Sequence, residues 1–581
     1  MSISTKKKIR NFGQVFIVLV GLLFLLTFAP ALHAATYYVD ATLGKDTNNG
    51  LSQTAAWKTI AKVTASKFTP GDRILFKRGE IWREQLTVPS SGSSENPITI
   101  GAYGRGALPV INGSNLLSSG WTQYGSTVWQ TSVSTRPNQV FFNGVRGTPV
   151  ASVAAINATS KWYWASNILY VYSTSDPATA FTSPGIEASI RTNAIYGINK
   201  SYITIDGLHL TKAKNSNFLL YNGNNYIVKN STLDYAWMAG VETSADNAGS
   251  ANFNPMFDNL NVSYNGADGF WIRKYTYGAI IQNSKIHHNE IETESLATRY
   301  NTGGGIYAGV VDVQKVTVQF NEIYNNGLSV HTTNTGVGVY YDGNNGDPAT
   351  DSFTTVAKSY IRYNYIHDNR CGTVVEYASN VVVSYNIITN SSGSGTGITT
   401  GSGIALINGV DTIEVYNNTV YNNKIGLKVE GIYPAKADNM INITVKNNIF
   451  TNSSTREARI IMGGENDGVY GYNNVYLNNC LGAQYSNFIE WGNGHTYGTY
   501  AYWETLYGGS THSVEADPKF ANAARNDFHL QSSSPCINAG VDVGLTLDYD
   551  GNGKYGAAWD IGAYEWRPSS SLSPPQSLRT K

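Results

Sequence analysis

The chain keeps repeating one short pattern from about residue 200 onward. In this pattern an aliphatic residue is flanked by asparagine and followed by Asn or Asp. The intervals between successive repeats run from 22 residues (Ile366 to Ile388) to 43 residues (Ile323 to Ile366). Short β-branched runs at such a period, separated by Asn and Gly, are typical of a stacked β-solenoid. We therefore predict an all-β chain of coils and no comparable set of amphipathic helices. The aliphatic positions are Leu208, Leu233, Val262, Ile286, Ile323, Ile366, Ile388, Val420, Ile449 and Val475.

An asparagine stands two positions before the aliphatic residue in the later repeats. Identical amides at one turn of each coil can hydrogen-bond along the stack, and Asn tolerates the left-handed backbone of such turns. We predict an architectural column without a chemical role. Its members are Asn321, Asn364, Asn386, Asn418, Asn447 and Asn473.

Several segments resemble the pectate-lyase-like superfamily of secreted bacterial proteins. YYVDATLGKDTNNGLSQTAAWKTI is similar to its amino-terminal cap, WYWASNILYVYSTSDP to a small β insert, and DIGAYEW to its closing segment. The resemblance implies a right-handed parallel β-helix of about ten or more coils with a small inserted β subdomain. This fold supports lyases, hydrolases, epimerases and adhesins, so it does not choose an activity.

The expected organisation begins with an export signal. Lys6, Lys7, Lys8 and Arg10 precede an apolar run and a small-residue cleavage site, which favours a Sec signal peptide over an uncleaved anchor. We expect a secreted, extracellular or periplasmic protein with no membrane contact after signal removal. The predicted segments are a signal peptide (1–35), a cap and first coils (36–139), a small β insert (140–195), the central helix (196–480), C-terminal coils with the closing segment (481–567) and a disordered tail (568–581).

The amino-acid composition limits the classes of partner that the chain is expected to bind. The chain has 41 basic and 41 acidic residues and is 14% charged, so no basic surface for nucleic acid is expected. Cys371, Cys480 and Cys536 lack the spacing of a zinc site or a disulfide framework, and we interpret them as buried thiols. We expect a monomer.

Short strands that follow a glycine separate two faces. In GFWIR, GIYAG, GVYYD, GTVVE, GIALI and GLKVE, the first and third residues after Gly are mostly apolar and should enter the core. The second and fourth should form an outward stripe of aromatic and charged residues, which suits a sugar chain. The predicted substrate-binding residues of this stripe are Trp271, Arg273, Tyr307, Tyr340, Lys428 and Glu430.

Two carboxylates of the stripe should lie on adjacent coils. If the strands align on their glycines, Asp342 and Glu376 are neighbours, and close carboxylates suit a retaining glycosidase. GVGVYYDG followed by GTVVEYASNVVVSYN also resembles the Asp-then-Glu arrangement of β-xylosidase-like β-helix glycoside hydrolases. That resemblance implies Asp342 as nucleophile and Glu376 as acid/base. Inserted loops at about 290–304 and 328–355 are expected to shape the site.

Two other functions remain open. ADGFWIRK resembles the ADGF-x-x-K strand of one pectate-lyase group, which implies a lyase or epimerase with Arg273 as base. Such an enzyme could use calcium (Ca²⁺), and Asp342, Asp347 and Asp351 are the candidate ligands; the hydrolase interpretation requires no cofactor and no metal. A non-catalytic glycan-binding surface protein needs only the stripe. All three interpretations predict a polysaccharide or oligosaccharide partner.

Overall fold

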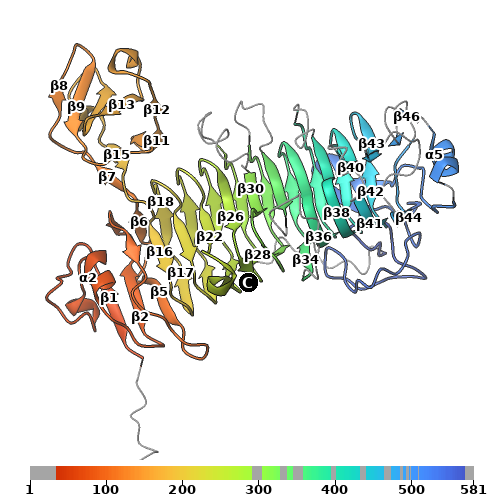
Figure 1. Ribbon diagram of the computed structural model, residues 1–581, viewed down its shortest axis with the longest axis horizontal. Coiled ribbons are helices and arrows are strands. Elements are labelled where there is room, and N and C mark those ends of the chain that lie inside the picture. Colours follow the sequence, from red (N-terminus) through yellow and green to blue (C-terminus); the bar gives the residue numbers. More distant parts are fainter. Residues whose placement is uncertain are drawn as a thin grey trace, which may run out of the picture.

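A computed structural model of the chain shows a long stack of coils that runs from a cap to a closing segment (Figure 1). The structure describes residues 34–290, 304–327, 336–343, 357–393, 401–431, 440–462, 473–483, 489–491, 496–497, 499–507 and 509–568. Nearly all of the predicted signal peptide and of the predicted tail lie outside these ranges. Within them, no helix is both long and apolar enough to span a bilayer.

Each coil contributes short strands to three parallel stacks. The first stack contains β1 (Thr36–Val39), β2 (Arg73–Lys77), β5 (Ile98–Tyr103), β17 (Ile203–Asp206), β20 (Tyr226–Lys229), β24 (Met256–Asp258), β28 (Ile280–Gln282), β31 (Thr317–Gln319), β34 (Ser359–Arg362), β36 (Cys371–Ser384), β38 (Ser402–Tyr416), β41 (Met440–Lys446) and β44 (Val475–Leu477).

The second stack, which we call the site stack, carries the predicted stripe. It contains β4 (Leu86–Thr87), β16 (Ile195–Ile198), β19 (Phe218–Tyr221), β22 (Val241–Ser244), β26 (Asp268–Arg273), β30 (Gly304–Gly309), β33 (Val337–Asp342), β36, β38, β40 (Ile425–Gly431), β43 (Arg456–Met462) and β45 (Ile489–Trp491), and ends on the antiparallel β46 (Thr496–Tyr497). Because β36 and β38 run through both stacks, the two form one 24-stranded sheet.

The third stack is an 11-stranded sheet that holds the repeated aliphatic residues from Leu233 to Ile449. The predicted repeat position Leu208 precedes β18, whose Leu210 pairs with Leu233, and Val475 lies in β44 of the first stack. It contains β3 (Ile81–Trp82), β6 (Val110–Asn112), β18 (His209–Thr211), β21 (Thr232–Asp234), β25 (Asn261–Ser263), β29 (Lys285–His287), β32 (Glu322–Tyr324), β35 (Tyr365–His367), β37 (Ile387–Thr389), β39 (Thr419–Tyr421) and β42 (Ile449–Thr451). The all-β, parallel coil architecture is as predicted.

The predicted small β subdomain is present as a lobe beside the cap (Figure 1). Its strands begin at Ser114, earlier than the expected 140–195, because β7 pairs with β15 and β9 pairs with β14. One sheet has the order β11-β10-β15-β7 and the other β12-β13-β14-β9-β8. The strands are β7 (Ser114–Leu116), β8 (Thr122–Gln123), β9 (Val128–Ser132), β10 (Val140–Phe142), β11 (Val145–Arg146), β12 (Thr148–Pro149), β13 (Lys161–Ala165), β14 (Ile168–Tyr172) and β15 (Ile186–Ser189).

The remaining elements are short. The α-helices are α2 (Ile60–Ala65), α3 (Pro177–Ala180) and α5 (Tyr500–Tyr507), and the further strands are β23 (Asn252–Phe253), β27 (Thr276–Tyr277), β47 (Phe520–Asn522) and β48 (Asp527–Leu530).

The predicted asparagine column exists, with a correction at its end. The side-chain Nδ2 of Asn321 donates to Oδ1 of Asn364 at 3.0 Å, and the same bond repeats to Asn386 and then to Asn418. The column then continues through Asn448 and Asn479 instead of the predicted Asn447 and Asn473. The register of β42, which pairs Phe450 and not Ile449 with Val420, moves the column to Asn448. Asn473 lies outside the column because it precedes β44, which pairs with β41 in the first stack.

A second asparagine column, which the sequence analysis missed, fixes the start of the site strands. Asn265, Asn289, Asn326 and Asn369 link successive coils through Nδ2–Oδ1 bonds of 2.9 to 3.1 Å. A Cβ atom on Gly338 would lie 3.1 Å from Nδ2 of Asn369 and 2.7 Å from the carbonyl oxygen of the next coil. Gly338 is the second residue of β33, and a Cβ atom there would also lie 2.6 Å from the Ile366 side chain. The packed side chain and the backbone of the next coil therefore leave no room for anything larger than glycine.

We expect the asparagine columns to carry much of the stability of the stack. Asn364→Ala removes bonds to Asn321, Asn386 and the Val318 carbonyl, all of them buried. The free energy of unfolding should fall by roughly 2 to 4 kcal/mol, because several buried polar groups lose their partners.

Asn473→Ala is the matched control. Asn473 is exposed, and its side chain donates to Oδ1 of Asn442 at 3.2 Å, so its substitution should change the melting temperature little. Calorimetry of both variants decides the point; equal losses of stability would contradict the revised column.

Candidate functional site

The structure separates the two faces of the site strands as predicted. Phe270 and Ile272 of β26 lie fully buried in the main core. Trp271, between them, belongs to a separate cluster on the other face of the strand. This second cluster contains Met238, Ala239, Trp271, Tyr307, Val337, Tyr340, Cys371, Val374, Ala405 and Ile407.

The stripe is not the exposed aromatic platform that the sequence suggested. Trp271, Tyr307 and Tyr340 are only 4%, 4% and 6% exposed. The rings of Tyr307 and Tyr340 meet edge to face, with centroids 5.1 Å apart, and do not form one flat surface. These aromatic side chains are therefore too enclosed to serve as an open surface on which a sugar ring could stack.

Asp342 and Glu376 are neighbours, which confirms the predicted alignment. In the parallel pairing of β30, β33 and β36, Tyr307 is opposite Tyr340, and Asp342 is opposite Glu376. Adjacent parallel strands lie about 4.8 Å apart, so both carboxylates project from one face at that spacing.

Each carboxylate accepts a hydrogen bond from a tyrosine of the preceding coil. The Tyr307 hydroxyl donates to Oδ2 of Asp342 at 2.5 Å, and the Tyr340 hydroxyl donates to Oε2 of Glu376. The amide of Asn408 donates to Oε1 of Glu376 at 2.5 Å. The two tyrosines thus hold the carboxylates in place, and this corrects their predicted role as stacking surfaces.

Asn408 is a residue that the sequence analysis missed. It follows Ile407, which is the fourth residue after Gly403 in β38, and has a left-handed backbone with φ of 56°. Gly343 and Tyr377, which follow Asp342 and Glu376, share this conformation. If the strand alignment had been extended to the fifth residue after each glycine, it would have shown Asn408 followed by Gly409 at that position.

Burial raises the pKa of both carboxylates, to different extents. Burial raises the pKa of Asp342 to about 6, against the hydrogen bond from Tyr307, which lowers it. Burial and then repulsion by Asp342 raise the pKa of Glu376 to about 7, against the hydrogen bonds from Tyr340 and Asn408 and the charge of Lys428. Asp342 keeps part of its side chain at the surface, whereas Glu376 is 4% exposed. Burial and mutual repulsion thus favour a pair that carries a single proton, with Glu376 the more enclosed of the two groups.

The predicted substrate-binding cations are already engaged by protein groups. Lys428 is 1% exposed, and its Nζ lies 2.9 Å from Oε2 of Glu430. Arg273 lies over the ring of Trp271, 4.2 Å from the centroid, with Nη1 3.4 Å from Oε1 of Glu242. Lys428 and Glu430 form an ion pair beyond Glu376 in which Lys428 is buried and Glu430 is partly exposed. The burial of Lys428 corrects the expectation that its side chain lies open to a substrate.

A third acid lies on the same face. Asp268 opens β26 and is 1% exposed, and neither of its carboxylate oxygens has a hydrogen-bond partner among the residues that the structure describes. Burial, together with the charges of Glu290 and Glu242, holds its pKa well above the usual range. The sequence placed it only within the ADGF resemblance.

The described residues contain no group of three His, Cys, Asp or Glu side chains able to hold a metal ion. The predicted ligands Asp347 and Asp351, and most of both predicted inserted loops, lie outside the described ranges. Cys371, Cys480 and Cys536 are buried free thiols, as predicted.

Comparisons with known proteins agree with the fold. The family model described as "Right handed beta helix region" matches residues 168–402. A lacto-N-biosidase of Bifidobacterium longum subsp. longum is 24% identical over an alignment that covers 91% of this chain and 36% of the relative. The chain thus spans about a third of the length of that curated relative.

One solved structure gives the same architecture. The complex structure of XylC with xylose matches with a TM-score of 0.54 and 16% identity, over 71% of this chain and 75% of that one. Pectate lyase Pel9A matches over 92% of this chain and 96% of that one, with 16% identity and a TM-score of 0.43. With parallel coils throughout and this family match over its centre, the chain is a right-handed parallel β-helix protein that resembles β-helix glycoside hydrolases.

Proposed function

We propose that this protein is a retaining glycoside hydrolase, with Asp342 as nucleophile and Glu376 as general acid/base. The observation that carries the proposal is the pair itself: two carboxylates on adjacent coils, each fixed by a tyrosine hydroxyl. The unequal pKa values supply one anion and one acid at neutral pH. The lacto-N-biosidase similarity supports a sugar substrate, which we propose to be an oligosaccharide or polysaccharide.

The first step forms a covalent intermediate. A carboxylate oxygen of Asp342 attacks the anomeric carbon, the bond from that carbon to the glycosidic oxygen breaks, and Glu376 transfers its proton to the leaving oxygen. In the second step the Glu376 carboxylate takes a proton from water, whose oxygen attacks the anomeric carbon and releases Asp342. The Tyr307 and Asn408 bonds hold the two carboxyl groups in orientation through both steps.

We expect removal of either carboxylate to abolish hydrolysis. Asp342→Asn and Glu376→Gln should each lower kcat by about 10²- to 10⁴-fold, because one loses the nucleophile and the other the proton donor. Reducing ends released from neutral and uronic glycans measure the effect. The matched controls Asp411→Asn and Glu414→Gln replace partly exposed carboxylates of β38 and should retain activity.

The same assay tests the lyase alternative. Elimination yields unsaturated uronate, which absorbs in the ultraviolet, and hydrolysis does not. If unsaturated product still forms after both substitutions, the hydrolase proposal is refuted and Arg273 becomes the candidate base of a lyase. We propose that no cofactor is required, so a chelator should leave hydrolysis unchanged; a loss of activity that Ca²⁺ restores would favour the lyase. Glycan binding without turnover by the wild type would favour a non-catalytic surface protein.

The pH profile should be bell-shaped. Activity requires Asp342 ionised, so it falls as the pH drops through about 6, and it requires Glu376 protonated, so it falls as the pH rises through about 7. Because the two groups interact, the measured values belong to the pair. Tyr340→Phe removes a hydrogen bond to the Glu376 carboxylate, and the alkaline limb of kcat/KM should move to higher pH. Tyr307→Phe should move the acidic limb upward for the same reason.

Tyr341→Phe is the control for both tyrosine variants. Its hydroxyl lies in the core and bonds to the Val313 carbonyl and Ser359, away from the carboxylates. It should lower stability without moving either limb. If Tyr307→Phe moves the alkaline limb instead, the two carboxylates have the opposite roles.

We also propose that the protein is exported by the signal sequence in residues 1–35. Amino-terminal sequencing of the mature protein should then begin near Ala35. Retention of Lys6 to Arg10 in the mature form would contradict this proposal.

A further inference from the structure

The five-stranded sheet of the inserted lobe has an outward face that carries tyrosines. Its inward residues Trp162, Leu169 and Val171 pack into the core of the lobe itself. Since side chains alternate along a strand, Tyr163, Tyr170 and Tyr172 point to the opposite face. All three are partly exposed.

Three of the tyrosines on this face form a contiguous aromatic surface. Tyr163 and Tyr170 are opposite each other in the pairing of β13 with β14, and their rings are stacked with centroids 6.3 Å apart and planes 30° apart. Tyr124, which follows β8 and is 57% exposed, meets Tyr170 edge to face at 5.2 Å. Exposed rings side by side offer a surface on which flat apolar faces can stack.

The sheet around the rings carries a single charged side chain, Lys161, which lies on the same face as Tyr163. β8, β9, β12, β13 and β14 contain no acidic residue, and their one basic residue, Lys161, bonds to Oδ1 of Asn157 at 2.7 Å. Between the rings the face offers polar uncharged groups, among them Thr122 and Gln130. The charge pattern therefore complements a neutral ligand with both apolar faces and hydroxyl groups, and a pyranose chain has both.

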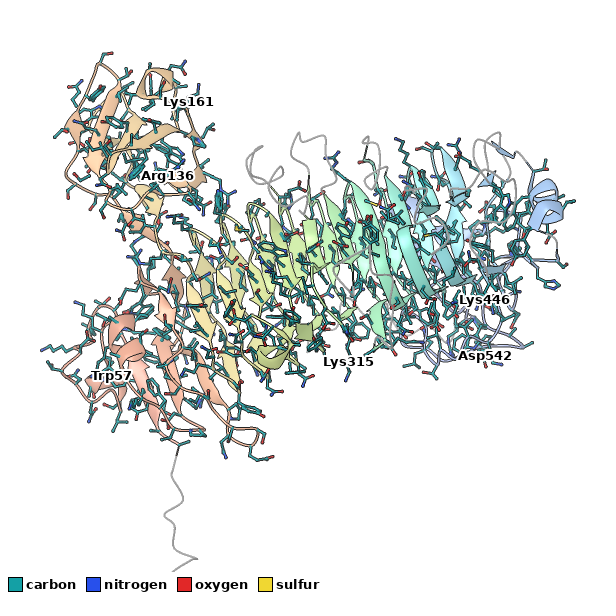
Figure 2. All side chains as sticks on the ribbon, in the orientation of Figure 1. Trp57, Arg136, Lys161, Lys315, Lys446 and Asp542 are labelled. Carbon is teal, nitrogen blue, oxygen red and sulfur yellow. The ribbon has the colours of Figure 1, made fainter. Side chains whose placement is uncertain are left out.

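The surface lies apart from the catalytic pair. The lobe projects beside the cap, whereas Asp342 and Glu376 lie on β33 and β36 in the middle of the stack (Figure 1). Figure 2 shows Lys161 of the same sheet in the part of the lobe away from the cap. Buried Glu187 ties the lobe to the coils: it bonds to Arg83 at 2.7 Å and pairs with Lys212.

We propose that Tyr124, Tyr163 and Tyr170 form a second carbohydrate-binding surface, which holds a neutral polysaccharide chain away from the catalytic pair. Binding there would keep the enzyme on a polymer while the coil stack acts on it. The surface requires no catalytic chemistry, so it can be tested separately from the proposed hydrolysis.

The test is affinity electrophoresis of the full chain in gels that contain xylan, β-glucan or galactan, with alginate as the charged comparison. Asp342→Asn is used as the background so that turnover cannot degrade the gel. At least one neutral polysaccharide should retard this protein, and the change Tyr163→Ala with Tyr170→Ala should weaken that retardation about tenfold or more. Tyr170→Phe keeps the ring and should retain most of the binding.

The controls separate binding from folding and from the proposed function. Tyr124→Ala alters an exposed residue outside the strands and should weaken binding without a change in melting temperature. Tyr555→Ala removes another exposed tyrosine, 38% exposed, and should leave binding intact. In the active background, the double variant should cleave short soluble substrates at the wild-type rate and lose activity only on polymers.

Three outcomes would overturn the proposal. They are the absence of retardation by every neutral polysaccharide, equal retardation of the double variant, and stronger retardation by alginate than by the neutral chains. If the double variant changes the sedimentation coefficient but not the retardation by polysaccharide, this face binds a second copy of the chain instead.

Discussion

The repeated hydrogen bond from one coil to the next is the constraint on which the rest of this molecule depends. Asparagine side chains repeat this bond along two columns. In the central site strands glycine is the second residue, because the aliphatic side chains of the third stack and the backbone of the next coil leave no room for a Cβ atom. The spacing of parallel strands then sets the distance between equivalent residues on neighbouring coils. Equivalent side chains on neighbouring coils therefore lie close enough to interact without a dedicated loop to hold them.

The candidate site uses this spacing to bring two acids together at a cost in solvation. A buried carboxylate is unfavourable when charged, and two of them repel, which is why both pKa values rise. Tyrosine hydroxyls one coil earlier offset part of that cost, each reaching diagonally to the next carboxylate. Asn408 and the Lys428–Glu430 ion pair lie on the Glu376 side. The result is an asymmetric pair built from a repeating scaffold.

The two aromatic regions illustrate how burial changes the use of one residue type. On the coils, Tyr307 and Tyr340 are enclosed, and their hydroxyls are committed to carboxylates. On the lobe, Tyr163 and Tyr170 stand on the outer side of a thin sheet whose apolar residues already pack inward. Rings on such a face remain partly exposed, whereas rings on the coils hold the two carboxylates in place.

The sequence by itself determined the solenoid, the alternation of the two faces and the pairing of Asp342 with Glu376. These depend on local period and parallel stacking, both of which are visible along the chain. Only the tertiary structure decided that the stripe is buried, that Tyr340 bonds to Glu376, and that the asparagine column shifts to Asn448. Coil lengths vary, so the phase of a column and the contacts between different positions of neighbouring coils depend on the register that each coil adopts when it packs. The hydrogen bond from Asn408 to Glu376 and the burial of Asp268 could not be predicted for the same reason. Both depend on side chains that are many residues away in the sequence.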